Sequence, residues 1–540
     1  MTRKENRLLK VKIFKLGPIE ESEVELKPFT ILFGKNNTGK TYVGYLLWGL
    51  ASQKGYYHHL EPKTETYKKT LQEFVSKLQE KKIPQHYLKF YEDLPVDYFL
   101  GEYTLNGLRA KIKKDFISRI FNHPIEFEGG EIIIPKNIKF SISAIVKSDD
   151  EIHEYESLLV KQLKNRGYSV SFRQHRICIR IKLAKIKVVD KGKKDELAEK
   201  SKEVKQENER DVEKTDRVSV VVTKDRKEVY HVFLILNSEA YQDLVHNCNE
   251  IFEDIVRGLI KGLIKEAVYI PASKSGLVLL SGFIARRKLR EEFRMDELQT
   301  EVEELKETLP EPLIDFIEKL PNFSPEKYYS DENRQFSKIV CFLEDNILKG
   351  KIKYIKHLGK IMYEFGNKKL PLQHSSSLVV EATPLLLYLK YSRLLDKGVL
   401  VIIEEPEAHL HPDAQRIIAR ALVRLVNRGL YVVLITHSPY MIQQINNCIR
   451  AQYLGKIGKL EKILEEFNWQ KEDVLEHSKV VSYLFDDSNG TVKIRKLEVD
   501  EKDGIPYDAF YPVLKDLHNE TERLKELFEG EETDDESRGN

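Results

Sequence analysis

A loop near the N-terminus constrains the fold of this chain more than any other feature. It follows the pattern G-x-x-x-x-G-K-[ST], and its residues are Gly34, Lys35, Asn36, Asn37, Thr38, Gly39, Lys40 and Thr41. The apolar run Phe29–Phe33 before it predicts a buried strand, and Tyr42–Leu50 after it predicts a helix. Because phosphate-binding loops join a strand to a helix in this way, the context favours a site over a chance match in a Gly/Asn turn.

The residue types of this loop suit a bound phosphate. Glycine lets backbone N–H groups turn inward, and the N-terminus of the next helix favours anions. The Lys40 side chain can reach the β- and γ-phosphates, and the Thr41 hydroxyl can ligate Mg²⁺. The loop therefore predicts a phosphate site with an associated magnesium ion.

A second feature lies far along the chain, where the run Val399–Ile403 leads directly into Glu404 and Glu405. An unbroken β-branched and Leu run is typical of a central parallel strand, and α/β sheets bind ligands at the C-terminal ends of such strands. Glu404 can hold Mg²⁺ directly or through water, and Glu405 can orient or deprotonate the water that attacks a γ-phosphate. The alternative is a strand that ends in a solvated acidic turn.

The next predicted strand, Leu430–Ile435, ends just before His437. Between the two strands, Asp413–Arg428 carries an apolar stripe at helical spacing. A right-handed crossover would place both strands in one parallel sheet. His437 could then donate a hydrogen bond to the γ-phosphate and report its presence, although a single histidine more often has a structural role.

In this order and spacing, three segments resemble the ATP-binding-cassette (ABC) head ATPases of the RecF, SMC and OLD-nuclease group: Gly34–Thr41, Glu404–Pro412 and Thr436–Pro439. The string Glu-Glu-Pro-Glu-Ala-His-Leu-His-Pro is typical of the prokaryotic OLD-like branch. The resemblance implies an α/β fold, a P-loop NTPase of the ABC head type with a split head and a mixed or parallel sheet. It also implies ATP and Mg²⁺ as ligands and an ATPase activity that yields ADP and phosphate.

The same resemblance implies roles for individual residues. Glu404 takes the Walker B position, where transporters carry Asp, and Glu405 is the catalytic acid. His437 is the switch histidine, and the loop 406–412 faces a partner subunit. The lysine and threonine that close the phosphate-binding loop contact phosphate and Mg²⁺.

Heads of this type also need a signature segment that completes the ATP site of a neighbouring subunit. Gln373–Ser377 leads into the predicted helix Leu378–Tyr391 and offers hydroxyls at an open helix N-terminus. The three candidate residues are Ser375, Ser376 and Ser377. The family usually has Gly at the position of Ser377, so the chain departs from the pattern there, and a plain Ser N-cap is the alternative.

The separation of these motifs predicts a split head with a long inserted arm. The expected divisions are 1–50 for the N-terminal half of the head, 51–265 for an inserted α+β and helical arm with a charged segment 190–217, 266–350 for a helical region, 351–450 for the C-terminal half of the head, and 451–540 for a hairpin, a helix and an acidic tail.

Periodicity inside the insertion predicts helices and a small antiparallel sheet. The expected helices are Tyr67–Lys81, Tyr87–Phe99 and Glu250–Glu266, and the expected strands are Glu131–Ile134, Ile138–Val146, His175–Val189 and Val218–Val222. The almost wholly charged stretch Lys191–Arg217 is either a solvated helix tip or a disordered loop. No heptad pattern of a long coiled coil occurs, so any arm should be short.

A further segment, Ala267–Gly276, resembles the Tyr-Ile-Pro-Ala-x-Arg-x-Gly motif of OLD-like ATPases, with Lys274 in the place of Arg. Lys274 is either a nucleotide sensor or a lysine of a surface loop, and it lacks the bidentate geometry of Arg. The next helix carries five cations that either contact a nucleic-acid backbone or form a solvated face: Arg286, Arg287, Lys288, Arg290 and Arg294.

Composition limits the location and the partners of the chain. No charge-free apolar stretch of about 18 residues and no signal peptide occur, so we expect a cytoplasmic protein without membrane contact. The four cysteines are scattered, which argues against a zinc site or a disulfide framework. Lys and Arg number 88 against 86 Asp and Glu, so any DNA binding must depend on how charge is arranged.

The C-terminal region bears on function, because OLD nucleases carry a metal-dependent TOPRIM nuclease there. This chain offers only a predicted hairpin, Val480–Phe485 with Thr491–Leu497, and a helix, Tyr507–Phe528, which is too little for that nuclease. By resemblance, we expect an ATPase that dimerises around ATP, or forms a higher oligomer, and acts in antiphage defence with a separate nuclease or effector protein. The alternatives are a RecF-like ATPase of DNA recombination and repair, and a nucleotide-gated scaffold with little turnover.

Overall fold

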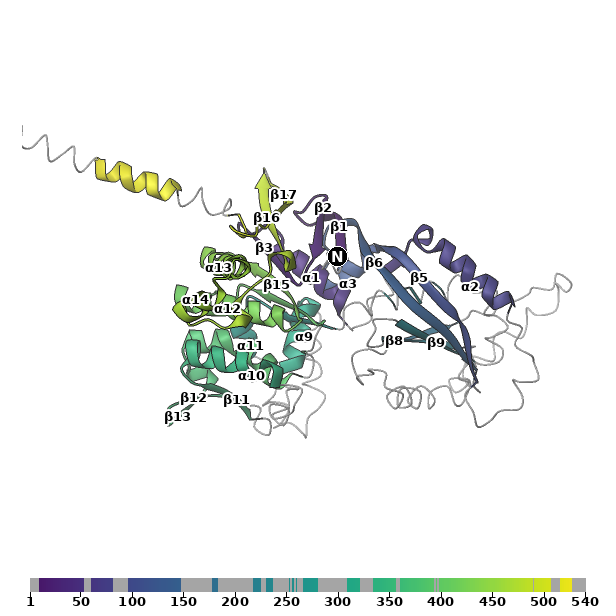
Figure 1. The fold of residues 1–540 in the computed structure, drawn as a ribbon, viewed down its shortest axis with the longest axis horizontal. Coiled ribbons are helices and arrows are strands. Elements are labelled where there is room, and N and C mark those ends of the chain that lie inside the picture. Colours follow the sequence, from purple (N-terminus) through teal and green to yellow (C-terminus); the bar gives the residue numbers. More distant parts are fainter. Residues whose placement is uncertain are drawn as a thin grey trace, which may run out of the picture. The chain divides into compact units, whose positions relative to one another are not determined.

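The structure is a computed structural model of the 540-residue chain (Figure 1). It describes residues 9–52, 60–80, 96–146, 177–182, 217–224, 230–236, 252, 255–256, 259, 266–279, 308–320, 334–355, 360–392, 395, 398–488, 490–506 and 515–526. The chain divides into two compact units. Unit 1 comprises residues 1–60, 110–135 and 264–540, and unit 2 comprises residues 61–109 and 136–263.

Unit 1 is built on a six-stranded sheet that is parallel from β10 to β16 and ends with the antiparallel strand β17. In spatial order its strands are β10 (Ala267–Ile270), β14 (Leu400–Glu404), β15 (Tyr431–Thr436), β3 (Phe29–Gly34), β16 (Val480–Ser488) and β17 (Thr491–Leu497). Every residue of β14 is buried, as expected for an apolar strand covered on both faces. The predicted α/β fold class is therefore confirmed.

Helices cover both faces of this sheet. On one face, α1 (Lys40–Ala51) packs its Tyr45 ring against Tyr269 of β10 and its Tyr42 ring against Phe121 of α3 (Lys114–Phe121). The other face carries a large apolar core supplied by α9 (Glu311–Lys319), α10 (Arg334–Leu343), α11 (Ser377–Tyr391), α12 (Pro412–Asn427) and α13 (Pro439–Lys456).

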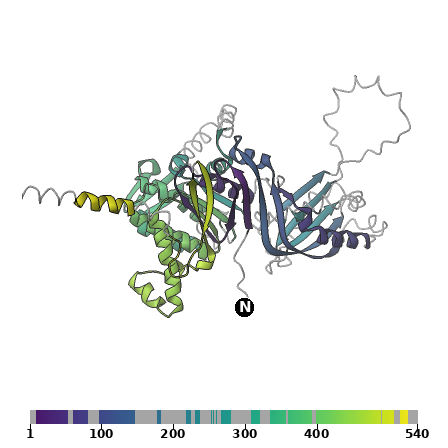
Figure 2. The same ribbon diagram turned by 90° about the horizontal axis from the view of Figure 1, so that it is seen from above.

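Strands from the N-terminal and C-terminal regions of the sequence meet in unit 1. Strand β1 (Leu9–Leu16) pairs in antiparallel fashion with β2 (Ser22–Leu26) and with the first part of β6 (Phe127–Val146). The Tyr483 hydroxyl of β16 accepts a hydrogen bond from the Glu25 N–H at 2.6 Å, and Ile19 bridges to Val492 of β17. Figure 2 shows the yellow C-terminal hairpin beside the purple N-terminal strands.

A small antiparallel sheet precedes α11 and consists of β11 (Lys351–Ile355), β12 (Lys360–Phe365) and β13 (Lys368–Pro371). It is joined to α11 by a buried ion pair. The Lys390 ammonium lies 2.6 Å from Glu344 Oε1 and donates to the Ile352 carbonyl at 2.7 Å. Glu344 begins a π-helix, η7 (Glu344–Leu348), that continues α10.

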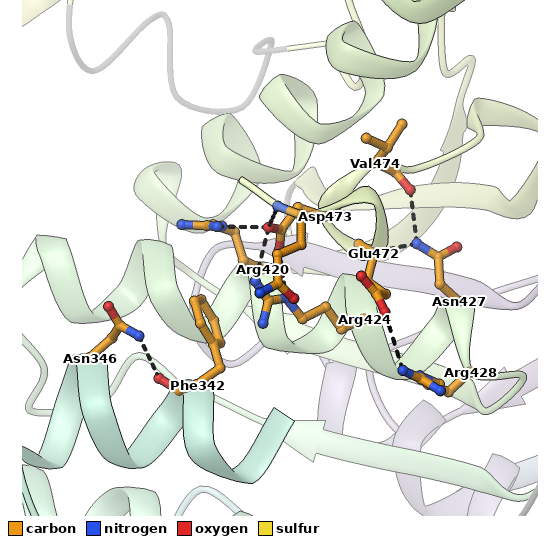
Figure 3. Close-up of polar contacts among 10 residues, drawn as sticks. Phe342, Asn346, Arg420, Arg424, Asn427, Arg428, Glu472, Asp473 and Val474 are labelled. Atoms are coloured by element: carbon orange, nitrogen blue, oxygen red, sulfur yellow. Dashed lines mark hydrogen bonds and ion pairs between the residues drawn. The ribbon is translucent and has the colours of Figure 1, made fainter. Parts of the chain in front are cut away.

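A second charged junction holds the segment after α14 (Leu460–Glu466) against α12 (Figure 3). Asp473 is fully buried and accepts hydrogen bonds from the guanidinium groups of Arg420 and Arg424, at 2.7 to 2.9 Å. These hydrogen bonds hold the pKa of Asp473 below its usual value despite burial. The Arg424 guanidinium also stacks over the Phe342 ring of α10 at 3.6 Å.

In the described part of unit 2, the helix α2 (Lys68–Glu80) accompanies a mostly antiparallel sheet. Its elements are β4 (Leu60–Pro62), α2, β5 (Val96–Ile112), the second part of β6, β7 (Ile177–Lys182), β8 (Arg217–Lys224) and β9 (Tyr230–Leu236). The sheet order is β6-β9-β8-β7, in which β6 and β9 are parallel. The Phe74 ring of α2 packs against Tyr103 of β5, beside which α2 runs in Figure 1, and against Phe252.

Several expectations for the insertion need revision. The predicted helix Tyr87–Phe99 is wrong over Val96–Phe99, which belongs to β5, because the alternation of buried and exposed residues around Tyr103 and Leu105 extends the strand backward. The two strands expected at 131–134 and 138–146 are one strand, β6. Residues 110–135 group with unit 1 rather than with the rest of the insertion.

Other expectations fall outside the described residues. They include the charged stretch 190–216, the cationic positions 286–294, most of the expected helix 250–266, and the tail 529–540. Among the helices that the structure describes, none combines the length and apolar character needed to cross a membrane.

Candidate functional site

The phosphate-binding loop connects β3 to α1, as its pattern predicts. Gly34 has φ 139°, and a Cβ atom there would lie 2.5 Å from the backbone oxygen of Phe485. Gly39, with φ 81°, is the N-cap of α1, and a Cβ atom there would lie 2.9 Å from Ile19. Both positions therefore require glycine, for the backbone angle and for space.

Lys40 begins α1 and is only 5% exposed. Its ammonium donates to the Gly34 carbonyl at 3.3 Å, to the Thr38 hydroxyl at 3.1 Å, and to the Lys35 carbonyl. Burial lowers the pKa of Lys40 to about 8, while the nearby Glu405 and Glu404 carboxylates act in the opposite direction. A buried cation beside loop carbonyls is suited to bind an anion that restores its full charge.

Glu404 ends β14 and is 4% exposed. Its Oε2 accepts a hydrogen bond from the Ala272 N–H at 3.2 Å, whereas its Oε1 is buried and has no hydrogen-bond partner in the described part of the chain. Burial raises the pKa of Glu404, and the neighbouring Thr41 and Tyr269 hydroxyls oppose this shift. A buried carboxylate oxygen beside a threonine hydroxyl is an all-oxygen donor set, which fits Mg²⁺.

Glu405 is 42% exposed and has a φ of 40°, which is uncommon outside glycine. Its N–H donates to the Ile435 carbonyl of β15 at 2.8 Å. Its Oε1 lies 3.7 Å from Nε2 of His437, the residue that follows β15. Burial and the positive charge of Lys40 lower the pKa of His437, so its imidazole is neutral at pH 7.

Glu407 is a functional candidate that sequence reasoning missed. Its Oε1 accepts hydrogen bonds from the Thr436 hydroxyl at 2.6 Å and from the His437 N–H at 2.7 Å. These bonds fix the segment that carries the histidine against the turn that carries the two acids. The only sequence signal for Glu407 was an acidic residue in the same turn as Glu404 and Glu405. Its hydrogen-bond partners lie 29 and 30 positions away in the sequence, so no local pattern contains them.

Several of these residues line one cavity of about 350 Å³, a volume suited to a small ligand. It is lined by Pro18, Asn36, Asn37, Thr38, Gly39, Lys40, Thr41, Tyr42, Glu405, Ile435 and His437. The fold therefore brings the loop of the N-terminal strand together with the acid and the histidine of the C-terminal strands. Glu404 lies next to the cavity, beside Thr41.

The three candidate signature residues do not line this cavity in the described structure. Ser376 is the N-cap of α11, but its hydroxyl makes no capping hydrogen bond, and both Ser376 and Ser377 are exposed. Ser375 is half-buried and donates to the Pro371 carbonyl at 3.4 Å. The residues Ser376 and Ser377 thus lie at the surface, at the N-terminus of a helix that packs against the six-stranded sheet.

A phosphate-binding loop at the end of one parallel strand, with carboxylates at the end of a second, defines a P-loop NTPase. The chain belongs to the family described as AAA ATPase domain, which matches residues 7–442. No curated protein matches the chain.

Solved structures of SMC heads are similar to this chain at low sequence identity. An SMC head bound to the C-winged helix domain of ScpA is 11% identical with a TM-score of 0.32, covering 92% of this chain and 98% of that chain. An SMC head with an extended coiled coil, bound to the C-terminal domain of ScpA from Pyrococcus furiosus, is 12% identical with a TM-score of 0.30, covering 97% and 98%. The SMC head domain from Thermotoga maritima is 9% identical with a TM-score of 0.27, covering 91% and 98%.

Proposed function

We propose that this chain binds ATP together with Mg²⁺ and hydrolyses it to ADP and phosphate. The observation that carries the proposal is the convergence of Lys40, Glu405 and His437 on one cavity, from strands that are far apart in the sequence. Thr41 and Glu404 lie together beside it. Family membership supports the same class of activity.

Each residue has a role that follows from its position. The Lys40 ammonium, already desolvated, neutralises the β- and γ-phosphates and gains a strong ion pair. The Glu405 carboxylate reaches the cavity and can accept a proton from the attacking water. The neutral His437 ring can donate an N–H to the γ-phosphate. Thr41 and Glu404 would hold Mg²⁺, which when bound neutralises the charge that develops on the phosphates.

We further propose that ATP joins two copies of the chain into a homodimer or a higher oligomer. The signature serines support this idea, because they lie away from the cavity of their own chain and two of them are exposed. They are therefore available to the nucleotide of a second copy. Completion of each site by another subunit would make hydrolysis depend on assembly.

The test is the solution mass of a Glu405→Gln variant with and without Mg-ATP. We expect ATP binding without hydrolysis and an ATP-dependent step from monomer to dimer. A Lys40→Ala, Glu405→Gln double variant is the control and should remain a monomer because it cannot bind nucleotide. Wild-type turnover in Glu405→Gln would remove its catalytic role, and an oligomer that forms equally without ATP would favour the nucleotide-gated scaffold.

For the biological role, we propose antiphage defence in the cytoplasm together with a separate nuclease or effector protein. The support is the OLD-like string at 404–412 and the position of the C-terminal hairpin, whose two strands belong to the ATPase sheet rather than to a further domain. Phage plating on cells that carry the gene with and without its neighbouring genes tests this role. Protection that needs a neighbouring nuclease gene supports it, and unchanged plating in both cases contradicts it.

A RecF-like role in DNA repair is the second candidate, and one described surface favours it. The outer face of the β11–β13 sheet carries Lys351, Lys353, Lys360 and Lys369 around a single acid, Glu364. Such a face suits a phosphate backbone. Changing Lys351, Lys353 and Lys369 together to Gln should weaken duplex binding and flatten its salt dependence, and hydrolysis stimulated by DNA would favour repair over defence.

A further inference from the structure

The loop that follows β10 holds both acids of the candidate ATP site. Strand β10 pairs with β14 in parallel register, with Ile270 beside Ile403, so the residues after each strand are neighbours. In this loop the Ala272 N–H donates to the Glu404 carboxylate at 3.2 Å, and the ammonium of Lys274, which begins the helical segment 274–279 after the loop, donates to the Glu405 carbonyl at 2.9 Å.

Lys274 is buried, with 2% of its surface exposed, and it does not line the cavity. The interpretation of Lys274 as a lysine of a surface loop is therefore wrong, and its ammonium contacts the backbone of Glu405 rather than the cavity. Its ammonium lies 3.0 Å from Oε2 of Glu381, which is also buried. Glu381 lies on α11, one turn after Ser377. One ammonium thus joins the β10 loop, the turn after β14 and the helix that starts at the signature serines.

The Glu405 backbone is the part of this junction that matters for catalysis. A φ of 40° costs about 1 to 3 kcal/mol in a residue other than glycine and persists only where the surroundings impose it. The Glu405 N–H donates to the Ile435 carbonyl. The Glu405 carbonyl accepts hydrogen bonds from the Lys274 ammonium and from the Ala408 N–H, the second at 3.1 Å. The direction of the Glu405 side chain follows from the orientation of these two peptide groups.

We propose that Lys274 is a positioning residue that fixes the main chain of Glu405 and couples it to α11. When the serines at the start of α11 contact a second copy, α11 shifts and Glu381 shifts with it. This changes the hydrogen bond from the Lys274 ammonium to the Glu405 carbonyl. The rate of hydrolysis then depends on the position of α11. The inference rests on the proposed hydrolytic role of Glu405.

A single substitution would leave one unpaired charge in a buried pair, which costs about 3 to 5 kcal/mol of stability. The experiment must therefore separate unfolding of the protein from displacement of the Glu405 backbone. We therefore compare two double variants that each remove a whole buried pair of α11. Lys274→Met with Glu381→Leu removes the proposed junction. Lys390→Met with Glu344→Leu removes the other pair, whose 2.6 Å separation and burial are similar but which lies against β11 and η7. Lys274→Arg tests rescue by a residue that keeps the charge.

The measurements are kcat, ATP affinity and amide hydrogen exchange of the segment 404–410, with melting temperature as the check on folding. In the Lys274/Glu381 double variant we expect kcat to fall about 10- to 100-fold while ATP affinity stays within about twofold, as for a misplaced catalytic group. Exchange at Ala408 should accelerate, because its acceptor is the Glu405 carbonyl. The Lys390/Glu344 double variant should change only the melting temperature. Lys274→Arg should have a higher kcat than the Lys274/Glu381 double variant, because it keeps the charge.

The outcomes separate the two proposals. A folded Lys274/Glu381 double variant with wild-type kcat and wild-type exchange at 404–410 overturns the positioning role. Wild-type protein that binds Mg-ATP without turnover overturns the proposed hydrolysis instead. In that case the exchange comparison alone decides whether Lys274 orders the Glu405 backbone.

Discussion

Lys40 is charged at neutral pH in a site that disfavours its charge, and this has a measurable consequence. Burial lowers its pKa to about 8 from an ordinary 10.5, and a bound triphosphate would raise it again. Below pH 8 the free protein already carries the proton, so ATP affinity should be constant. Above pH 8, binding must take up a proton, and affinity should fall by up to about tenfold per pH unit.

Titration calorimetry between pH 7 and 10 measures this dependence. A Lys40→Met variant should bind ATP weakly and show no slope above pH 8. In the nucleotide-free protein the sign is opposite: the free energy of unfolding should rise between pH 8 and 10.5, because the unfolded chain then holds the proton more tightly than the folded one. A flat wild-type affinity across this range would contradict the placement of Lys40 at the phosphates.

Gly34 supports a second prediction about a single residue. In Gly34→Ala the new methyl group would meet the Phe485 carbonyl at 2.5 Å, so β16 must shift and the phosphate-binding loop with it. The free energy of unfolding should fall by more than about 1 kcal/mol, and ATP affinity should fall as well. Gly276→Ala is the matched control, since no atom lies within 4 Å of its added methyl group. Equal melting temperatures for the two variants would contradict the close approach.

Single residues differ in how well the sequence predicts them. Lys40, Thr41 and the two acids lie in short patterns whose chemistry depends on neighbours in the chain, so the pattern alone locates them. Glu407 and Lys274 act through Thr436 and Glu381, which are distant in sequence. Their roles depend on strand order, and no local pattern contains that information.

The C-terminal hairpin, β16 with β17, is part of the ATPase sheet and not an appendage to it. The first six residues of β16, Val480–Phe485, pair with the whole length of β3, the strand that leads into the phosphate-binding loop. A chain that ends at residue 479 would leave that edge of β3 unpaired and its apolar face uncovered, so we expect insoluble protein without ATP binding. A chain that ends at residue 514 loses the described helix 515–526, whose residues are all exposed, and should keep its melting temperature and ATP affinity.

Circular dichroism, melting and nucleotide titration of the two truncated chains measure this difference. A stable, ATP-binding chain ending at 479 would contradict the structural role of the hairpin. The two strands themselves were predictable from their alternation and the turn between them. Their partner β3 was not, because that pairing joins residues about 450 positions apart, as Val480 opposite Phe29 illustrates.

The order of the strands in unit 1 explains why the motifs alone gave the class of protein. Strand β3 from the N-terminal region lies between β15 and β16 from the C-terminal region, so the cavity lined by Lys40, Glu405 and His437 forms only when both regions have folded together. The sequence predicts a long insertion between the motifs. The grouping of 110–135 with unit 1 was not predictable, because it follows from long-range packing of α3 on α1.

The last prediction concerns two copies of the chain. If the signature serines of one copy complete the site of another, two inactive variants should restore activity when mixed. Lys40→Ala removes nucleotide binding but leaves Ser375–Ser377 intact, and Ser377→Arg blocks the signature but leaves the cavity intact. In a symmetric dimer each hybrid contains one complete site, so an equal mixture that exchanges freely should reach about a quarter of wild-type turnover.

Steady-state ATP hydrolysis of the mixture against its total concentration tests this expectation, with each variant alone as the baseline. A third chain that carries both substitutions is the control, because mixing it with either single variant creates no complete site. Full activity of Ser377→Arg alone would mean that the cavity works without the serines of a neighbour. Inactive mixtures from variants that demonstrably exchange subunits would mean that Ser377 acts within its own chain, because no chain of the hybrid carries both an intact Lys40 and an intact Ser377.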